Sequence, residues 1–105
     1  MIGETLYRRG TTFVRRLRLA PGETTEWHRD PFHRITVVLT GDVLEIEYRD
    51  RRPSVRVSLA PGQVDWDEPM DSLHRALNVG GQPYEEIVVF LLDHPDAVAQ
   101  PTGEE

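Results

Sequence analysis

The stretch GETTEWHRDPFHRITVVLTG, residues Gly22–Gly41, decides the fold of this chain. Its first half carries two residues that can bind a metal, His28 and Asp30, and its second half is the β-branched run Arg34–Thr40. Side chains alternate between the two faces of an extended strand, so His28 and Asp30 point to the same side. This spacing is typical of two ligands that one strand presents to one ion.

Turns and short strands fill the rest of the chain. Dense Pro and Gly residues separate short runs of Val, Ile, Leu and Thr, and no window long enough for a helix keeps an apolar stripe intact. The expected strands are Thr12–Ala20, Thr25–Arg29, Arg34–Thr40, Val43–Arg49, Ser54–Leu59, Gln63–Trp66, Leu73–Val79 and Glu85–Asp93. Because Gly41-Asp42 separates two of them closely, we expect a hairpin there. The pattern predicts an all-β sandwich or barrel.

Two segments repeat one signature. LAPGETTEW spans Leu19–Trp27, and LAPGQVDW spans Leu59–Trp66. Each is a strand, a Pro-Gly turn and a second strand. The repeat indicates either pseudo-symmetry between two sheets or the general frequency of Pro-Gly turns.

The length of 105 residues predicts a single domain, 1–105, with a barrel core at about 12–93. We expect the Pro-rich and acidic tail, residues 94–105, to be flexible. From Ile87 onward the strand Glu85–Leu92 is apolar on both faces, which requires a cover on its outer side. A second subunit would supply that cover, so we expect a homodimer; the alternative is that His94–Glu105 folds back over the strand.

Composition excludes several classes of function. The net charge of −6 argues against a nucleic-acid partner, because phosphate binding needs a basic face. The chain has no cysteine and no lysine, which excludes thiolate and Schiff-base chemistry. The apolar runs are too short for a signal peptide or a membrane span, so we expect a cytoplasmic protein and no membrane partner.

The spacing of the site residues resembles the two motifs of the cupin family. In the first, the family places Gly, His, His, Glu and Gly where this chain has Gly22, His28, Asp30, Arg34 and Gly41. In the second, the family's Gly, Pro, Gly, His and Asn match Gly62, Pro69, Asp71, His74 and Asn78. The resemblance covers roughly Thr12–Asp93. It implies a small single-domain cupin, a double-stranded β-helix or jelly-roll barrel with a pocket at its mouth.

The resemblance also implies a metal, although this chain departs from the family's three histidines and one glutamate. Asp30 replaces a histidine and Arg34 replaces the glutamate. The remaining His28, Asp30 and His74 form a two-histidine, one-carboxylate set that suits iron(II), and also manganese, nickel or zinc. A fixed guanidinium charge beside a divalent cation is repulsive, which counts against the metal.

Arg34 therefore has three interpretations. It can neighbour a metal, it can form an ion pair with Asp30 in place of the metal, or it can bind the carboxylate of a small ligand. His33 is a candidate acid–base group, with an ordinary loop histidine as the alternative. Trp27 and Asn78 are further candidates for ligand contact; otherwise Trp27 is a core or rim aromatic and Asn78 bonds to neighbouring backbone.

Two classes of function stay open at this point. The first is a mononuclear metal cupin that acts on a small polar or carboxylate-bearing metabolite, with His28, Asp30 and His74 as ligands. The second is a metal-free cupin binding module that holds a small anion. A fold does not decide between an enzyme and a binding module.

Overall fold

The computed structural model describes residues 1–92, and within that range it contains nine strands and no helix. The strands are β1 (Ile2–Arg9), β2 (Thr12–Leu19), β3 (His28–Asp30), β4 (His33–Thr40), β5 (Val43–Tyr48), β6 (Val55–Ser58), β7 (Val64–Asp67), β8 (Met70–Asn78) and β9 (Tyr84–Leu91). They form a five-stranded sheet in the order β1-β2-β9-β4-β7 and a four-stranded sheet in the order β3-β8-β5-β6. Every pairing is antiparallel. The all-β prediction is confirmed.

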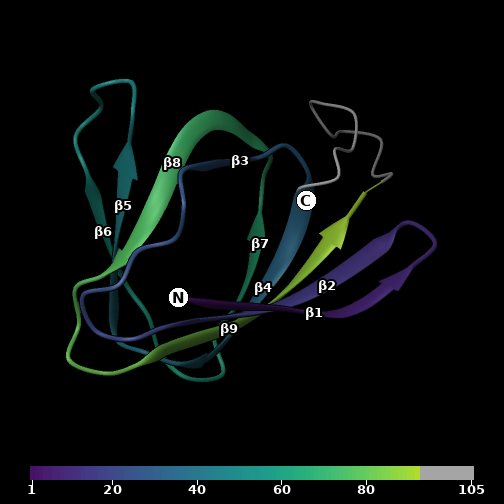
Figure 1. Cartoon of the computed structure of the whole chain (residues 1–105), viewed down its shortest axis with the longest axis horizontal. Coiled ribbons are helices and arrows are strands. Elements are labelled where there is room, and N and C mark those ends of the chain that lie inside the picture. Colours follow the sequence, from purple (N-terminus) through teal and green to yellow (C-terminus); the bar gives the residue numbers. More distant parts are fainter. Residues whose placement is uncertain (93–105) are drawn as a thin grey trace.

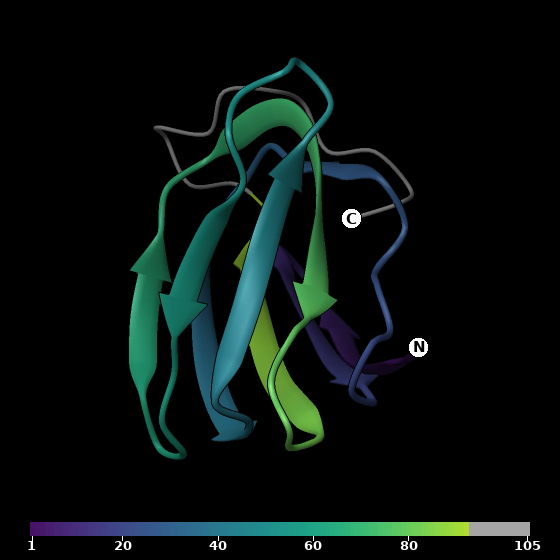
Figure 2. The same cartoon turned by 90° about the vertical axis from the view of Figure 1, so that its left-hand side faces the viewer.

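The two sheets face each other as the two sides of a barrel (Figures 1 and 2). The chain passes repeatedly from one sheet to the other, so strands that are neighbours in sequence, such as β4 and β5, often lie in different sheets. Inward-facing side chains from both sheets therefore enclose one interior.

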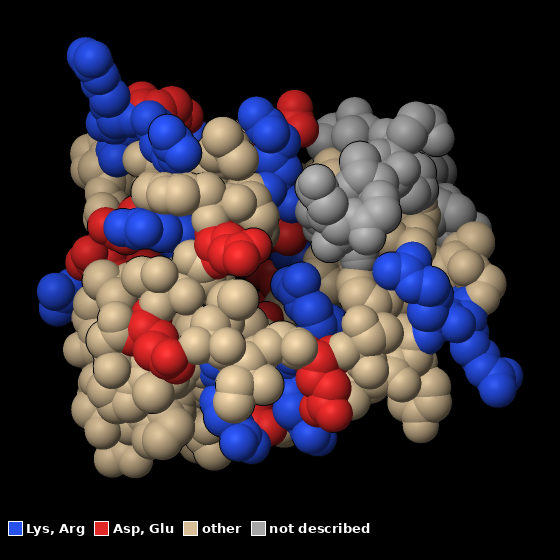
Figure 3. Space-filling view, in the orientation of Figure 1, with Lys and Arg blue, Asp and Glu red and all other residues tan. Residues whose placement is uncertain are grey.

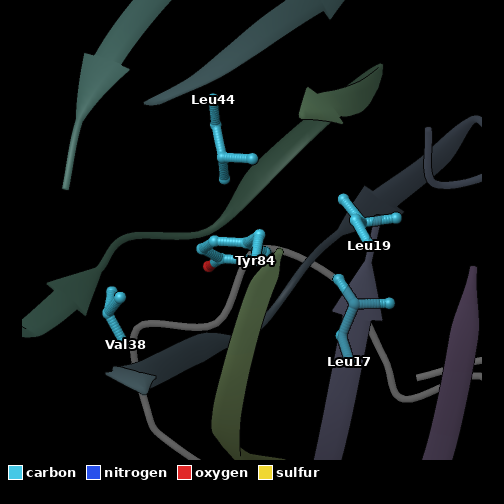
Figure 4. Close-up of a cluster of buried hydrophobic side chains, with 5 residues drawn as sticks. All are labelled: Leu17, Leu19, Val38, Leu44 and Tyr84. Carbon is cyan, nitrogen blue, oxygen red and sulfur yellow. The ribbon is translucent and has the colours of Figure 1, made fainter. Parts of the chain in front are cut away.

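Apolar side chains close the interior in two clusters. Figure 4 shows the first, in which Leu44 of the four-stranded sheet faces residues of the five-stranded sheet; its members are Leu17, Leu19, Val38, Leu44 and Tyr84. The second cluster consists of Phe13, Phe32, Val88 and Phe90. Each fully buried side chain of this size contributes about 1.5–3 kcal/mol through the hydrophobic effect.

The two Pro-Gly turns have the same geometry. Gly22 and Gly62 both have a φ of 87°, which the second central residue of a type II turn requires. The N–H of Glu23 donates to the Ala20 carbonyl at 3.0 Å, and the N–H of Gln63 donates to the Ala60 carbonyl at 3.0 Å. Each turn takes the chain from one sheet to the other, so the repeated signature corresponds to a structural repeat.

Gly41-Asp42 does not form the predicted hairpin. The flanking strands β4 and β5 lie in different sheets, and β5 instead forms a hairpin with β6. Gly41 has a φ of 128°, and a Cβ there would lie 2.8 Å from Cδ1 of Tyr84. This residue therefore turns the chain across the barrel against an aromatic ring rather than back along β4.

β1 was not predicted from the sequence, and β3 begins three residues later than predicted. β1 pairs with β2 from Ile2↔Arg18 to Arg9↔Thr12, although its exposed residues gave no apolar pattern. The predicted strand Thr25–Arg29 is irregular up to Trp27 and is preceded by an isolated bridge from Thr24 to Leu77; the strand itself is His28–Asp30. The predictions for residues 94–105 lie outside the described part of the chain.

The outer face of the five-stranded sheet is apolar. Ile35 is paired with Trp66 and Val89, and Val37 is paired with Val64 and Ile87. These positions alternate with the residues that line the interior, so they point outward. Val64 is 62% exposed and Trp66 is 50% exposed. On the face shown in Figure 3, in contrast, positive and negative side chains are interspersed. No helix within residues 1–92 is long and apolar enough to cross a membrane.

Candidate functional site

A cavity of about 850 Å³ occupies the barrel interior. The five-stranded sheet contributes Arg15, Arg34, Thr36, Asp67 and Glu86 to its wall, and the four-stranded side contributes Trp27, His28, Asp30, Tyr48 and His74. Both walls therefore present polar side chains to the same space. A cavity of this size accommodates a small metabolite.

Three of the predicted ligands meet in this cavity. Oδ2 of Asp30 lies 2.9 Å from Nε2 of His74 and 3.3 Å from Nε2 of His28. One ligand atom from each of the three residues lies within 4.8 Å of the others. Asp30 and His74 are buried, and the His28 side chain is 30% exposed.

The backbone of β3 and β8 brings these residues together. His28 is directly opposite His74, whereas Asp30 is opposite Met70, so the register shifts between the two pairs. β8 has more residues than β3 between the paired positions, which is the signature of a bulge. The shift leaves His28 and Asp30 on one side of a short strand, next to His74.

Backbone carbonyls orient both imidazole rings. Nδ1 of His28 lies 2.7 Å from the Glu26 carbonyl oxygen, and Nδ1 of His74 lies 2.9 Å from the Ser72 carbonyl oxygen. A carbonyl only accepts hydrogen bonds, so Nδ1 carries the proton in each ring. In the neutral rings, both Nε2 atoms then present lone pairs to the cavity, as in metal-binding histidines.

Electrostatics at the cluster keep Asp30 ionised. Burial disfavours the carboxylate, but the hydrogen bonds with His28 and His74 and the charge of Arg34 outweigh it and hold the pKa of Asp30 far below its usual range. For His28, burial lowers the pKa, but the hydrogen bond and charge of Asp30 outweigh it and raise the pKa overall. The cluster thus favours a cation beside Asp30.

The chemistry of the donor set fits a divalent metal ion. With both Nδ1 atoms protonated, two Nε2 lone pairs and an acceptor-only carboxylate oxygen converge, and lone pairs repel unless a positive species lies among them. A proton on an imidazole meets that need in the metal-free protein, and a metal ion meets it by accepting all three lone pairs. Two histidines and one carboxylate suit iron(II) and related first-row metals.

Arg34 is near this cluster but is held mainly by backbone. Its Nη1 donates to the Phe32 carbonyl at 3.3 Å and to the Glu68 carbonyl at 3.2 Å. Nη2 lies 3.7 Å from Oδ2 of Asp30, longer than either histidine contact. The ion pair considered from the sequence therefore exists as the longest of the Asp30 contacts.

The other predicted site residues divide between the cavity and its surroundings. Trp27 lines the cavity, with the guanidinium carbons of Arg75 and Arg49 at 4.5 Å and 5.3 Å from its ring centre. His33 is not among the cavity-lining residues of the described chain; its Nε2 lies 2.8 Å from Glu68, and its ring packs on Trp66. The geometry therefore gives no support to His33 as the acid–base group of this cavity.

Asn78 bonds to backbone on all sides. Its Nδ2 donates to the Leu19 and Gln82 carbonyls at 3.1 Å and 2.8 Å, and its Oδ1 accepts from the Gly80 N–H at 3.0 Å. It is 1% exposed. These contacts match the structural alternative for this residue, since they use both amide hydrogens.

The structure adds polar cavity residues that the sequence did not reveal. The Tyr84 hydroxyl donates to Oε1 of Glu86, and the Thr36 hydroxyl donates to Oδ2 of Asp67 at 2.6 Å. Burial raises the pKa of Glu86, although the Tyr84 hydrogen bond partly opposes this. The sequence signal that could have identified Glu86 is the alternation in β9, because Glu86 shares a face with the apolar or aromatic residues Tyr84, Val88 and Phe90.

Comparison with solved structures identifies the fold. A cupin domain from Bordetella pertussis Tohama I has a TM-score of 0.76 and 22% identity over 86% of this chain and 91% of that chain. An RmlC-like cupin family protein with a double-stranded β-helix fold from Methanocaldococcus jannaschii has a TM-score of 0.67 and 14% identity over 86% of this chain and 78% of that chain. Oxalate oxidase in complex with the substrate analogue glycolate has a TM-score of 0.59 and 22% identity, over 81% of this chain and 44% of that chain.

The protein is therefore a small cupin in its fold, a double-stranded β-helix with a His-Asp-His cluster in its interior. The predicted fold and the predicted resemblance are both confirmed. No protein-family model matches the chain, and no curated protein matches it.

Proposed function

We propose that this chain binds one divalent metal ion through His28, Asp30 and His74, and that the cavity beside the ion holds a small carboxylate-bearing or polar molecule. One observation carries the proposal. Two imidazole Nε2 atoms, each oriented by a backbone carbonyl, face the same carboxylate oxygen. Iron(II), manganese, nickel and zinc are the candidate ions.

Three protein ligands leave coordination positions for a ligand or water. A metal held by His28, Asp30 and His74 would supply Lewis-acid chemistry to a molecule in the cavity. The protein's part is to exclude bulk water and to orient the ligand against the His-Asp-His cluster. The glycolate in the oxalate oxidase structure supports the idea that this fold holds small carboxylates.

A metal-free binding module is the second candidate. Its support is the 3.7 Å approach of Arg34 to Asp30, because a guanidinium can balance the carboxylate without an ion. In that case His28, His74 and Arg34 would bind a small anion directly. The two candidates differ in one measurable property, the retention of metal.

Elemental analysis of untagged protein tests the proposal. The wild type is stripped with chelator, incubated with iron(II), manganese(II), nickel(II) or zinc(II), and desalted. We expect about one equivalent of at least one metal on the wild type. His74→Ala and Asp30→Asn should lose it, and His33→Gln, a histidine outside the cavity, should retain it. If the wild type keeps no metal, or if His74→Ala keeps as much as the wild type, the metal proposal is wrong.

We also propose that a second copy of this chain covers the outer face of the five-stranded sheet. The apolar positions of β9, β4 and β7 form one continuous surface across three strands, with Ile87, Val37 and Val64 in one row. Contiguous apolar surface of this kind is typical of protein interfaces. A two-fold contact would place the same surface on both copies.

A further inference from the structure

We propose that Arg15, on the opposite wall from the His-Asp-His cluster, is the anion-binding residue of the cavity and anchors the carboxylate of its ligand. The inference rests on the proposed function for the identity of the cavity as a ligand site. It differs from the sequence expectation, which gave the carboxylate-binding role to Arg34.

The position of Arg15 follows from the register of the five-stranded sheet. Arg15 lies on β2 directly opposite Val88 of β9, and both line the cavity. Its neighbours on β2, Val14 and Arg16, point to the outer face because side chains alternate along the strand. Arg15 thus places its guanidinium in the barrel interior.

Arg15 has no carboxylate partner within ion-pair distance among residues 1–92. Its Nε atom is buried and makes no hydrogen bond. Its guanidinium carbon lies 5.2 Å from the centre of the Phe90 ring, which supports the cation from one side. A buried polar hydrogen without an acceptor costs free energy, so an anionic acceptor in the cavity would be favoured.

Arg34 and Arg15 differ in how many of their hydrogen-bond donors are free to bind a ligand. Arg34 donates to two carbonyls and approaches Asp30, so its donors are largely engaged. The planar guanidinium of Arg15 still has parallel N–H donors available, and their geometry matches the two oxygens of a carboxylate. Arg15 is therefore the better anchor of the two.

The acidic residues of the cavity leave Arg15 accessible. Asp65 lies in the same transverse row as Arg15 but three strands away, beyond Val88 and Thr36, which is about 14 Å at ordinary strand spacing. Its Oδ2 accepts a hydrogen bond from Gln63 at 2.8 Å. Glu86 is diagonal to Arg15 and accepts the Tyr84 hydroxyl, and burial favours its neutral form.

The charge of Arg15 acts on both sides of the cavity. It disfavours protonation of His28 on one wall and of Glu86 on the other. A carboxylate bound to Arg15 would compensate this charge and would face the His-Asp-His cluster. The rest of the ligand would then extend toward the proposed metal.

Binding of a carboxylate to the metal-free protein tests this inference separately from metal binding. Propionate is titrated into chelator-treated protein and followed by amide chemical shifts, with propionamide as the matched neutral probe. We expect saturable shifts with propionate only. Arg15→Gln should weaken propionate binding at least ten-fold, and Arg15→Lys should restore part of it because the charge returns without the fork. Arg18→Gln, an exposed arginine of the same strand, should bind as the wild type does.

Thermal unfolding supplies a second readout. Propionate should raise the melting temperature of the wild type and leave that of Arg15→Gln unchanged, because only the wild type binds it. An equal rise in both proteins would show that the carboxylate binds elsewhere, and this would overturn the inference. Failure of the wild type to bind propionate, or full binding by Arg15→Gln, would overturn it as well. Metal loading of Arg15→Gln in the same assay shows whether the proposed metal site stands independently.

Discussion

Nε2 of His74 lies 2.9 Å from Oδ2 of Asp30, while Nδ1 of the same ring is held by the Ser72 carbonyl. The short contact therefore needs either a proton on Nε2 or a metal ion that accepts both lone pairs. The proton and the metal ion therefore compete for the position between Nε2 of His74 and Oδ2 of Asp30. Asp30 also contacts Nε2 of His28 and raises the pKa of that histidine, which links the chemistry of the site to pH.

Metal binding should accordingly release protons and tighten as pH rises. The cause is the raised pKa of His28, whose proton must leave before its Nε2 can bind an ion. Calorimetric titration with zinc(II) in two buffers of different ionisation enthalpy measures the number of protons released. Asp30→Asn should weaken binding by more than the roughly 10–100-fold typical of losing a residue that only supports a ligand. An affinity that is independent of pH between 5.5 and 8 would contradict the prediction.

The stability of the metal-free protein should depend on pH through the same groups. The pKa of His28 is raised above 6.5, so its contribution to stability is fully present below that value and is lost as pH rises through the folded-state pKa. The pKa of Asp30 is lowered below 3.8, so its contribution is present above that value and is lost as pH falls. Urea unfolding from pH 3 to pH 9 measures the high-pH limb and the upper part of the acid limb. His28→Gln should flatten the high-pH limb contributed by this residue, and a wild-type slope in that variant would exclude His28 as its source.

Asn78 should matter for stability rather than for ligand binding. Asn78→Ala removes two donors and one acceptor from buried backbone partners, which should cost about 2–4 kcal/mol in the free energy of unfolding. Urea denaturation measures the loss. The folded variant should retain as much metal as the wild type. A loss of ligand binding without a loss of stability would instead show that Asn78 contributes to binding.

Gly41 should resist substitution by alanine. Gly41→Ala forces a side chain into a φ of 128° and against the Tyr84 ring, which should cost about 1–3 kcal/mol or more. Gly81→Ala is the matched control, because a Cβ there meets nothing within 4 Å. Thermal unfolding compares the two. Equal melting temperatures for both variants would mean that the turn adapts and that the contact with Tyr84 does not fix the bend.

The proposed dimer predicts different effects for two exposed valines. Val64 is 62% exposed on the apolar outer face of the five-stranded sheet, and Val55 is 50% exposed on β6 of the other sheet. Light scattering after size exclusion should show a dimer for the wild type and for Val55→Glu, and a monomer for Val64→Glu. If the wild type is a monomer at high micromolar concentration, the proposed dimer is wrong.

Strand alternation and turn spacing predicted an all-β sandwich or barrel, and the resemblance to the cupin motifs implied that His74 joins His28 and Asp30. Strand alternation and the spacing of turns are local properties, and they were enough to place His28 and Asp30 on one face. The sheet partners are not local. Gly41-Asp42 has the composition of a hairpin turn, but β5 pairs with β6 and β8 of the other sheet rather than with β4.

Arg15 and Glu86 were missed for a related reason. Each is a single polar residue in a strand whose inward row is otherwise mainly apolar, and an isolated charge usually indicates an exposed position. Their inward direction becomes clear only when β2, β9 and β4 are in register. The acid–base role of His33 stays a prediction; the structure places its Nε2 2.8 Å from Glu68 and its ring on Trp66, outside the cavity lining of the described residues.

The edge position of β3 has a consequence for how this protein can lose its site. Two of the three cluster residues, His28 and Asp30, lie on a three-residue strand that pairs only with β8. Such a segment can detach at a small fraction of the free energy needed to melt the whole barrel. An ion or ligand that stabilises the pairing of β3 with β8 would therefore slow amide hydrogen exchange in β3. Exchange in β9 would stay nearly unchanged.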